Sequence, residues 1–394
     1  MARFGKLVVT RSNMSKEQFG EVQKKLVERY PQVCQEIDDT VSKIAALVRR
    51  LPPDELLKRA YWEMAVRHIN KPTEAELKAD DAVAVRMIDY VQSIIASVIP
   101  ENTAESQVTD EQWQELRGLV EELFSRLNSD YQICLTAFNR QRLDFNKEHE
   151  EFYFKAQLYW CNVRGRRYLF HEIPFFRDVL FPHDLVLKEL YGIGINELLA
   201  ALKQIQDSLT LGLGKMAEDL FKFREVTLSE LRKRIESGDI QETDSVRTLL
   251  NTVIEENKWD NWREDIFGRF AGLDLFDLEK VTSLPRILLD DFSWEPGQNT
   301  EFFKEGDYKG WPLRIWPIFQ RPFIKLKKRY YCFELYNLFD NLYRTLQKTI
   351  VRRKPEYAKT WNEKQKQLSE RLPIELLRSL LPDAKSLEHL LSMA

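Results

Sequence analysis

Apolar residues recur every three or four positions over long stretches of this chain, and that spacing constrains its fold more than any other feature. The clearest run contains Trp113, Leu116, Val120, Leu123 and Leu127. Such spacing places the side chains on one face of an α-helix. Only 14 glycines and 15 prolines interrupt the 394 residues, which favours long helices over a fold with many turns.

Three of these runs follow a helix-start signal, in which Ser or Thr precedes Glu or Gln by three residues. The signals are Ser15 with Gln18, Thr73 with Glu76, and Thr109 with Gln112. In this arrangement each side chain accepts a hydrogen bond from the backbone N–H of the other residue. We therefore expect helices to begin just after residues 15, 73 and 109.

The apolar run after residue 109 continues, with a one-residue slip, towards residue 160. A helix over 109–160 would have coiled-coil character, because its seam repeats at spacings of three and four. Its apolar seam requires a cover, either from another helix of this chain or from a partner. The sequence therefore predicts a possible protein partner, or self-association, through the 109–160 helix.

Breaks in the helical pattern suggest three domains and a mainly α-helical fold. Basic residues and a glycine at 164–167 interrupt the periodicity, and prolines, glycines and aromatic residues become dense after residue 284. We expect a helical bundle over 1–162, a middle helical domain over 163–283, and a C-terminal α+β module over 284–394. That module is expected to contain a β-hairpin over 323–333, with a turn at Lys327 and Lys328.

Composition excludes several classes of protein. Hydrophobic residues make up 43% of the chain, which is enough to form large cores and excludes global disorder. The formal net charge is −3, so nucleic-acid binding would need a local basic patch. No apolar stretch has the length of a membrane span or of a signal-peptide core. The four cysteines (Cys34, Cys134, Cys161 and Cys332) are far apart, which favours the reducing cytoplasm.

No catalytic or metal-binding motif is present. The glycine pairs 192/194 and 212/214 lack the third glycine and the preceding strand of a dinucleotide site, so they are better interpreted as helix ends. The five histidines (His68, His149, His171, His183 and His389) include no pair at zinc-ligand spacing, so we interpret them as surface or hydrogen-bonded residues. We expect no cofactor and no metal.

Charge is distributed unevenly near the C-terminus. Residues 264–307 are rich in Asp and Glu, whereas residues 321–354 are rich in Lys and Arg. Basic side chains neutralise phosphates and aromatic rings stack on bases, so the hairpin is the candidate nucleic-acid contact. Its residues are Arg321, Lys325, Lys327, Lys328, Arg329, Tyr330 and Tyr331. Alternatively, the adjacent acidic and basic segments pair with each other.

The last third of the chain also carries a resemblance to a known group. The residues that carry it are Leu275-Phe276-Asp277-Leu278, Leu284-Pro285, Leu288-Leu289, Ser293, Pro296-Gly297, Phe302, Arg321-Pro322-Phe323-Ile324, Tyr330-Tyr331, and the stretches 335–344 and 361–371. Their order resembles the helical region of bacterial proteins that carry a C-terminal restriction-endonuclease-like domain. The resemblance implies a link to nucleases or defence systems. Such a nuclease domain would begin where this chain ends, so no catalytic residue transfers to it, and we expect a fragment or a form without its nuclease.

Three functions remain open at this stage. The first is a non-catalytic helical interaction module that contacts nucleic acid without sequence specificity. The second is a structural scaffold that oligomerises through the 109–160 helix. The third is an enzyme whose catalytic groups converge only in the folded chain.

Overall fold

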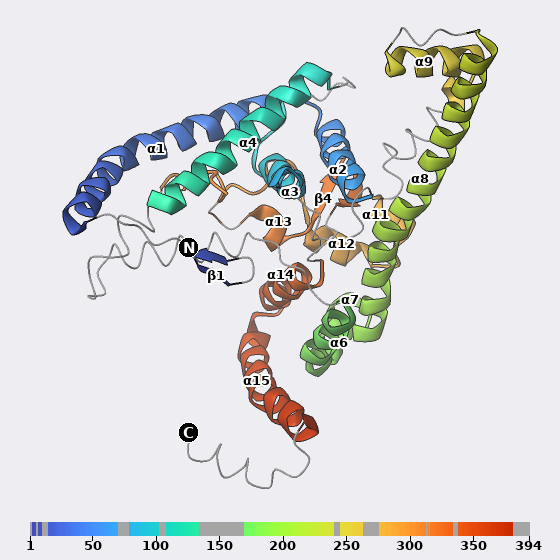
Figure 1. Ribbon diagram of the computed structural model, residues 1–394. Coiled ribbons are helices and arrows are strands. Elements are labelled where there is room, and N and C mark those ends of the chain that lie inside the picture. The colour runs from blue at the N-terminus through green and yellow to red at the C-terminus, as the bar shows by residue number, and fades with distance from the viewer. Residues whose placement is uncertain are drawn as a thin grey trace. The chain divides into compact units, whose positions relative to one another are not determined.

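Helices dominate the computed structural model (Figure 1). It describes residues 2–4, 7–9, 15–69, 79–101, 108–133, 169–239, 245–262, 276–306, 308–312, 314, 316–333 and 338–380. Within these residues the strands form only a two-stranded and a three-stranded sheet. The mainly α-helical fold with a small α+β part, predicted from the sequence, is confirmed.

The chain divides into two compact units that each combine distant segments. The first unit contains residues 1–165 and 296–317, and the second contains residues 166–295 and 318–394. The predicted division into three consecutive domains, with limits at 162/163 and 283/284, stays a prediction.

Among the described residues, four helices build the first unit. They are α1 (Lys16–Arg50), α2 (Pro53–Ile69), α3 (Ala79–Ser97) and α4 (Asp110–Ile133), preceded by the antiparallel strands β1 (Ala2–Phe4) and β2 (Leu7–Val9). The predicted start of α1 is confirmed, because Ser15 Oγ accepts a hydrogen bond from Gln18 N at 3.2 Å and Gln18 Oε1 accepts one from Ser15 N at 2.9 Å. Thr109 and Gln112 form the same arrangement before α4. The start signal at residue 73 lies outside the described residues.

The apolar seam of α4 is covered within the chain. Leu116, Val120 and Leu123 are fully buried, as are Ile37 and Ile44 on α1. Figure 1 shows α4 lying along α1, and these two helices make the most extensive helix–helix contact of the described residues. The seam from Trp113 to Leu127 therefore packs in cis. The remainder of the helix predicted over 109–160 lies outside the described residues after Ile133.

Segment 296–317 returns to the first unit from far along the chain. Gly297 N donates to Ile95 O at 3.1 Å, and Asn299 N donates to Ala96 O at 2.8 Å. The Tyr90 hydroxyl donates to Gly310 O at 2.7 Å and is fully buried. The segment thus completes the core over α3, although it is about two hundred residues away in sequence.

The second unit contains one very long helix and several shorter ones. The long helix is α8 (Ile195–Ser237), and the others are α6 (Leu169–Leu180), η3 (Phe181–His183), α7 (Asp184–Tyr191), α9 (Val246–Glu256), α11 (Leu278–Val281), α12 (Arg286–Phe292), α14 (Leu338–Arg353), η5 (Pro355–Tyr357) and α15 (Ala358–Leu380). Helix α9 packs against the C-terminal part of α8 through Leu231, Leu249 and Val253.

Glycines act differently at two of the predicted helix ends. Gly192 ends α7 in the left-handed conformation with φ 73°, as a C-terminal cap should. The pair Gly212 and Gly214, however, lies inside α8, so the interpretation of this pair as a helix end is wrong. Each glycine weakens a helix by only about 1 kcal/mol relative to alanine, so a helix as long as α8 continues through both.

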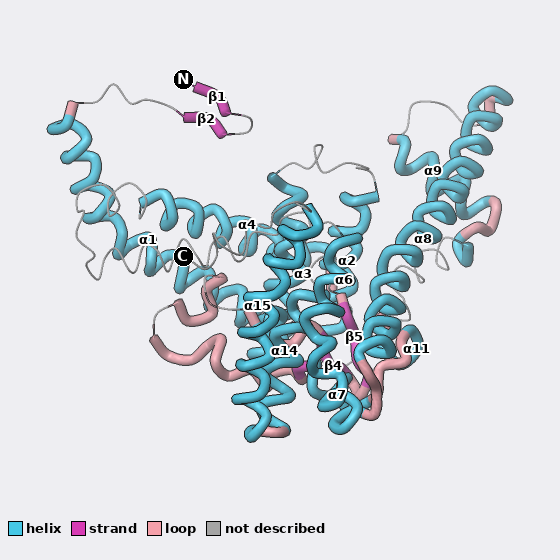
Figure 2. Tube along the Cα trace, turned by 90° about the horizontal axis from the view of Figure 1, so that it is seen from below, coloured by secondary structure: helices cyan, strands magenta, loops and turns pink. Residues whose placement is uncertain are grey.

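A three-stranded sheet lies in the second unit (Figure 2). Strand β3 (Ser293–Trp294) pairs in parallel with β4 (Phe323–Leu326), and β4 pairs antiparallel with β5 (Arg329–Cys332). The short helix α13 (Pro317–Gln320) precedes β4. The predicted hairpin is confirmed, with its turn at Lys327 and Lys328 and with β5 ending one residue before the predicted limit at 333. Helix α12 contacts β4 and α11 contacts β5.

Candidate functional site

The tip of the β4–β5 hairpin is a two-residue turn. Lys327 and Lys328 have φ angles of 48° and 70°, and Leu326 pairs with Arg329 across the turn. Two consecutive left-handed residues give the turn geometry that matches the twist of a two-residue hairpin. Both lysine side chains and that of Arg329 are exposed, as the nucleic-acid prediction requires.

The two tyrosines of the hairpin face inwards. Tyr330 is 0% exposed and its hydroxyl donates to Asp290 Oδ1 at 2.6 Å. Tyr331 is 4% exposed and its ring stacks near Phe333, with 6.3 Å between ring centroids. Base stacking needs an open ring face, so in this arrangement neither ring offers a stacking surface.

Other basic residues of the hairpin are paired with the acidic segment. Lys325 Nζ lies 3.1 Å from carboxylate oxygens of both Asp290 and Glu295, and hydrogen bonds to these carboxylates raise the pKa of Lys325. Arg329 Nη1 lies 3.7 Å from Oδ2 of the buried Asp277. The alternative that the sequence left open, internal pairing of acidic and basic segments, therefore describes Lys325 and Arg329. The predicted contact of the whole hairpin with nucleic acid stays a prediction.

Arg321 lies apart from the hairpin tip, beside the first strand of the sheet. Its guanidinium carbon lies 4.1 Å from the centroid of the Trp294 ring, and Nη1 donates to Ser293 O at 3.1 Å. Burial lowers the pKa of the Arg321 guanidinium, and the nearby charge of Arg352 lowers it further. The two guanidinium groups are thus close enough to repel each other.

A buried carboxylate gathers the arginines at the end of α14. The Asp291 side chain is 6% exposed and accepts hydrogen bonds from Arg352 at 2.8 Å and from Arg353 at 2.5 and 2.8 Å. The Tyr191 hydroxyl also donates to Asp291, at 3.3 Å. Two guanidinium groups thus bind one carboxylate, and the charge of Asp291 also acts on Arg321, so these four side chains have a net charge of +2.

Helix α14 extends this positive charge along one exposed face. Arg344, Lys348 and Arg352 are spaced four residues apart, which places them about 6 Å apart on one side of the helix. All three are exposed. In the part of the chain that the structure describes, no carboxylate pairs with Arg344 or Lys348. We call Arg321, Arg344, Lys348 and Arg352 the α14 basic face.

The sequence placed Arg344, Lys348 and Arg352 in the basic segment 321–354, but the predicted nucleic-acid contact at the hairpin did not include them. The signal that could have found them is their i, i+4, i+8 spacing within a predicted helix. The proximity of Arg321 to Arg352 depends on long-range packing of α14 near the start of β4, where the Thr345 hydroxyl donates to the carbonyl of Gln320. No local pattern reports this packing.

One buried histidine is held by three side chains. His183 is 0% exposed and stacks on Trp361 with 3.8 Å between ring centroids. The Gln365 amide donates to His183 Nε2 at 2.9 Å, so Nδ1 carries the proton and donates to the Tyr357 hydroxyl at 3.1 Å. Burial, followed by the charge of Lys364, lowers the pKa of His183 to about 4. The prediction of hydrogen-bonded histidines is confirmed here.

Among the described residues, no group of three or more His, Cys, Asp and Glu side chains could hold a metal ion. No helix in the described ranges combines the length and the apolar character needed to span a membrane.

No protein-family model, curated protein or solved structure matches this chain. The resemblance to the helical region of nuclease-linked proteins therefore stays a prediction from sequence.

Proposed function

We propose that this protein is a helical interaction module that contacts the phosphate backbone of nucleic acids through the α14 basic face. The observation that carries the proposal is the row of Arg344, Lys348 and Arg352 on one exposed helix face. Such a row attracts polyanions because each basic side chain that meets a phosphate releases a condensed counterion.

The dimensions of this face suit a nucleic-acid backbone. Arg344 and Arg352 are eight residues apart, which corresponds to about 12 Å along the helix. One strand of a duplex carries a phosphate about every 3.4 Å of axis, so the face spans about three or four phosphates. Contacts to phosphate oxygens position a protein on the duplex but carry no sequence information, so binding through this face should be independent of sequence.

A salt titration tests this proposal. Four contacts to duplex DNA predict a slope of about −3.6 for the logarithm of affinity against the logarithm of salt concentration. Affinity should then fall about a hundredfold between about 50 and about 200 mM salt. Fluorescence anisotropy with labelled DNA and RNA of unrelated sequences measures both the slope and the independence of sequence.

Charge-matched variants locate the contact. Arg344→Gln with Lys348→Gln should weaken binding and reduce the magnitude of the slope by about two. Lys222→Gln with Arg224→Gln removes two exposed charges from α8 of the same unit and should leave binding unchanged. Equal loss in both double variants, or no loss in the α14 variant, would show that binding is not centred on α14.

Variants at the hairpin tip separate the two basic surfaces. Lys327→Gln with Lys328→Gln also removes two exposed charges and should weaken binding less than the α14 variant, because these lysines lie at the hairpin tip and not on α14. Loss of binding in this hairpin variant alone would assign the contact to the hairpin, as the sequence first suggested. The proposed link to a nuclease or defence system rests on the sequence resemblance alone.

A second candidate function, a protein-binding scaffold, is favoured by exposed apolar side chains. Phe175, Phe181 and Leu185 are 62%, 63% and 80% exposed and lie within eleven residues of one another. Exposed apolar groups of this size are typical of contact surfaces when they are contiguous. If the native protein self-associates, its mass measured by light scattering should exceed the monomer mass at high protein concentration. The double variant Phe181→Asp with Leu185→Asp should then have a lower mass under the same conditions. A native protein that keeps the monomer mass at high concentration would exclude self-association.

A further inference from the structure

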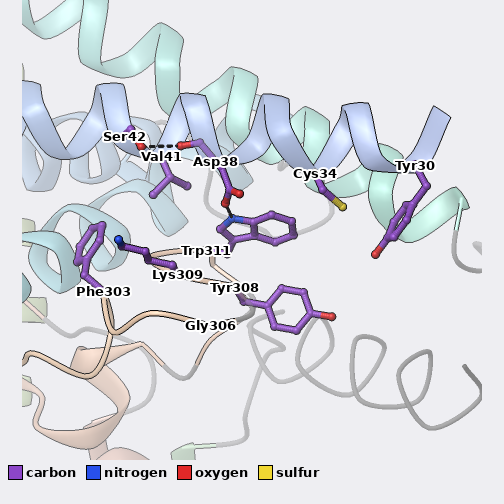
Figure 3. Close-up of a pocket in the computed structure, with 10 residues that line it drawn as sticks. All are labelled: Tyr30, Cys34, Asp38, Val41, Ser42, Phe303, Gly306, Tyr308, Lys309 and Trp311. Atoms are coloured by element: carbon purple, nitrogen blue, oxygen red, sulfur yellow. Dashed lines mark hydrogen bonds between the residues drawn. The ribbon is translucent and has the colours of Figure 1, made fainter. Parts of the chain in front are cut away.

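The first unit contains a groove between helix α1 and segment 303–311 (Figure 3). Its volume is about 640 Å³, which lies within the range of small-molecule sites. Helix α1 contributes Tyr30, Cys34 and Asp38, which are spaced one turn apart on one face. The segment contributes Tyr308 and Trp311, and Figure 3 shows the Trp311 indole pointing towards Asp38.

The segment that forms one wall has an unusual backbone. Gly306, Tyr308 and Gly310 have φ angles of 117°, 63° and 67°. Left-handed φ is costly for an aromatic residue such as Tyr308, and strain of this kind concentrates at functional sites. A Cβ atom at Gly310 would lie 2.5 Å from Phe303 and 2.8 Å from Val41, so the segment packs directly against α1.

The aromatic wall is held rigidly. Trp311 is 3% exposed, and its Nε1–H donates to Asp38 Oδ1 at 2.5 Å. The Tyr308 ring lies 5.2 Å from the Trp311 ring, and the Tyr90 hydroxyl fixes the carbonyl of Gly310. Rigid aromatic walls lose little conformational entropy when a ligand binds.

Charge at this groove favours a positively charged ligand. The Asp38 carboxylate is exposed, and no described side chain donates to its second oxygen, Oδ2. Lys309 lies at the other end of the groove, beside Phe303 in Figure 3, and its ammonium is 3.9 Å from the Glu305 carboxylate. Asp38, Glu305 and Lys309 together have a net charge of −1.

We propose that this groove binds an organic cation, namely an alkylammonium or methylated ammonium group. The Asp38 carboxylate, held by the buried Trp311, forms the ion pair with the cation, and the rings of the half-buried Tyr30 and Tyr308 provide cation–π contacts. Aromatic rings beside a carboxylate recognise such head groups, because the negative face of each ring attracts a poorly hydrated cation.

A pair of isosteric probes tests the charge requirement. Choline carries a trimethylammonium group, and 3,3-dimethyl-1-butanol carries an uncharged group of the same shape. Isothermal titration calorimetry should show choline binding at least about tenfold more tightly than the alcohol. Equal affinity for the two probes, or no heat from choline at saturating concentration, would overturn the proposal.

Variants on α1 assign the contact to particular residues. Asp38→Asn keeps an oxygen that accepts from Trp311 but removes the charge, and it should weaken choline binding about tenfold or more. Asp39→Asn changes the neighbouring exposed carboxylate, which accepts from Gln35, and should leave binding unchanged. Tyr30→Phe should bind like the native protein, whereas Tyr30→Leu should lose affinity. Equal binding by Asp38→Asn and Asp39→Asn would refute the ion pair.

Protection of the Cys34 thiol places the ligand in the groove. Choline should slow iodoacetamide alkylation of Cys34, measured by mass spectrometry of its peptide, and the uncharged alcohol should not. Alkylation that choline leaves unchanged would exclude this groove as the site.

A peptide that carries trimethyl-lysine distinguishes the source of the cation. Binding of this peptide at least about tenfold tighter than binding of choline would identify a protein side chain as the ligand, and weaker or equal binding would identify a free small cation.

Discussion

Leu123 on α4 offers the most direct test of how the first unit is held together. The side chain is 0% exposed and lies on the seam between α4 and α1. Leu123→Ala removes three carbon atoms from this interface. Their transfer out of water is worth about 2.4 kcal/mol at about 0.8 kcal/mol per carbon. The cavity left behind adds about 1 to 2 kcal/mol, because a packed seam relaxes only in part.

The expected loss in the free energy of unfolding is therefore about 4 kcal/mol. Urea denaturation followed by circular dichroism measures it. With a slope of about 2 kcal/mol per molar urea, the midpoint should fall by about 2 M. If the two units unfold in separate transitions, only the transition of the unit that contains α1 and α4 should move.

Leu185→Ala is the matched control. This leucine is 80% exposed on α7, so the same chemical change should alter the free energy of unfolding by less than about 0.5 kcal/mol. A midpoint for Leu123→Ala that equals that of the native protein, or an equal shift in both variants, would show that α4 does not pack on α1 as described.

Two further predictions concern the second unit. Because the pKa of His183 is lowered to about 4 from 6.5, the unfolded chain binds an extra proton between these pH values, so stability should fall as pH falls through this window. The urea midpoint of the native protein should therefore be lower at about pH 5 than at about pH 7.5, and His183→Phe should make this difference smaller. An equal difference in the native protein and the variant would contradict the burial of His183. Lys328 has a φ angle of 70° in the hairpin turn, so Lys328→Gly should stabilise the protein by about 0.5 to 1 kcal/mol in thermal unfolding. Destabilisation by Lys328→Gly would mean that the lysine side chain makes a contact worth more than the backbone strain.

Much of the local structure follows from spacing alone. The start of α1 at Ser15, the seam of α4 and the turn of the hairpin at Lys327 and Lys328 were all predicted correctly. Each depends on residues within about four positions of one another, where propensity and hydrogen bonding act locally. The error at Gly212 and Gly214 also comes from local reasoning, because a glycine pair is a weak breaker signal and α8 continues through it from Ile195 to Ser237.

The candidate sites were less visible. Sequence pattern identified the basic segment, but it could not show that Tyr330 and Tyr331 are both buried. Alternation along a strand places successive side chains on opposite faces, so one of the two tyrosines would be expected to face solvent. Both are buried because the hairpin is covered on both faces. The exposed row of basic residues on α14 is therefore a better candidate for the nucleic-acid contact than the hairpin.

The sequence by itself determined that this chain forms long helices, where several of them begin, and that a two-residue hairpin interrupts them. Only the tertiary structure decided which distant residues meet. Trp311 donates to Asp38 across 273 residues, and Arg353 reaches Asp291 across 62. Helical periodicity shows that a face must be covered, but it does not show which segment covers it. The free energy of burial depends on the apolar area removed from water and is the same for any apolar partner of that area. The groove on α1 and the position of Arg321 beside Arg352 arise from such long-range contacts, whereas the row of Arg344, Lys348 and Arg352 follows from local spacing on α14.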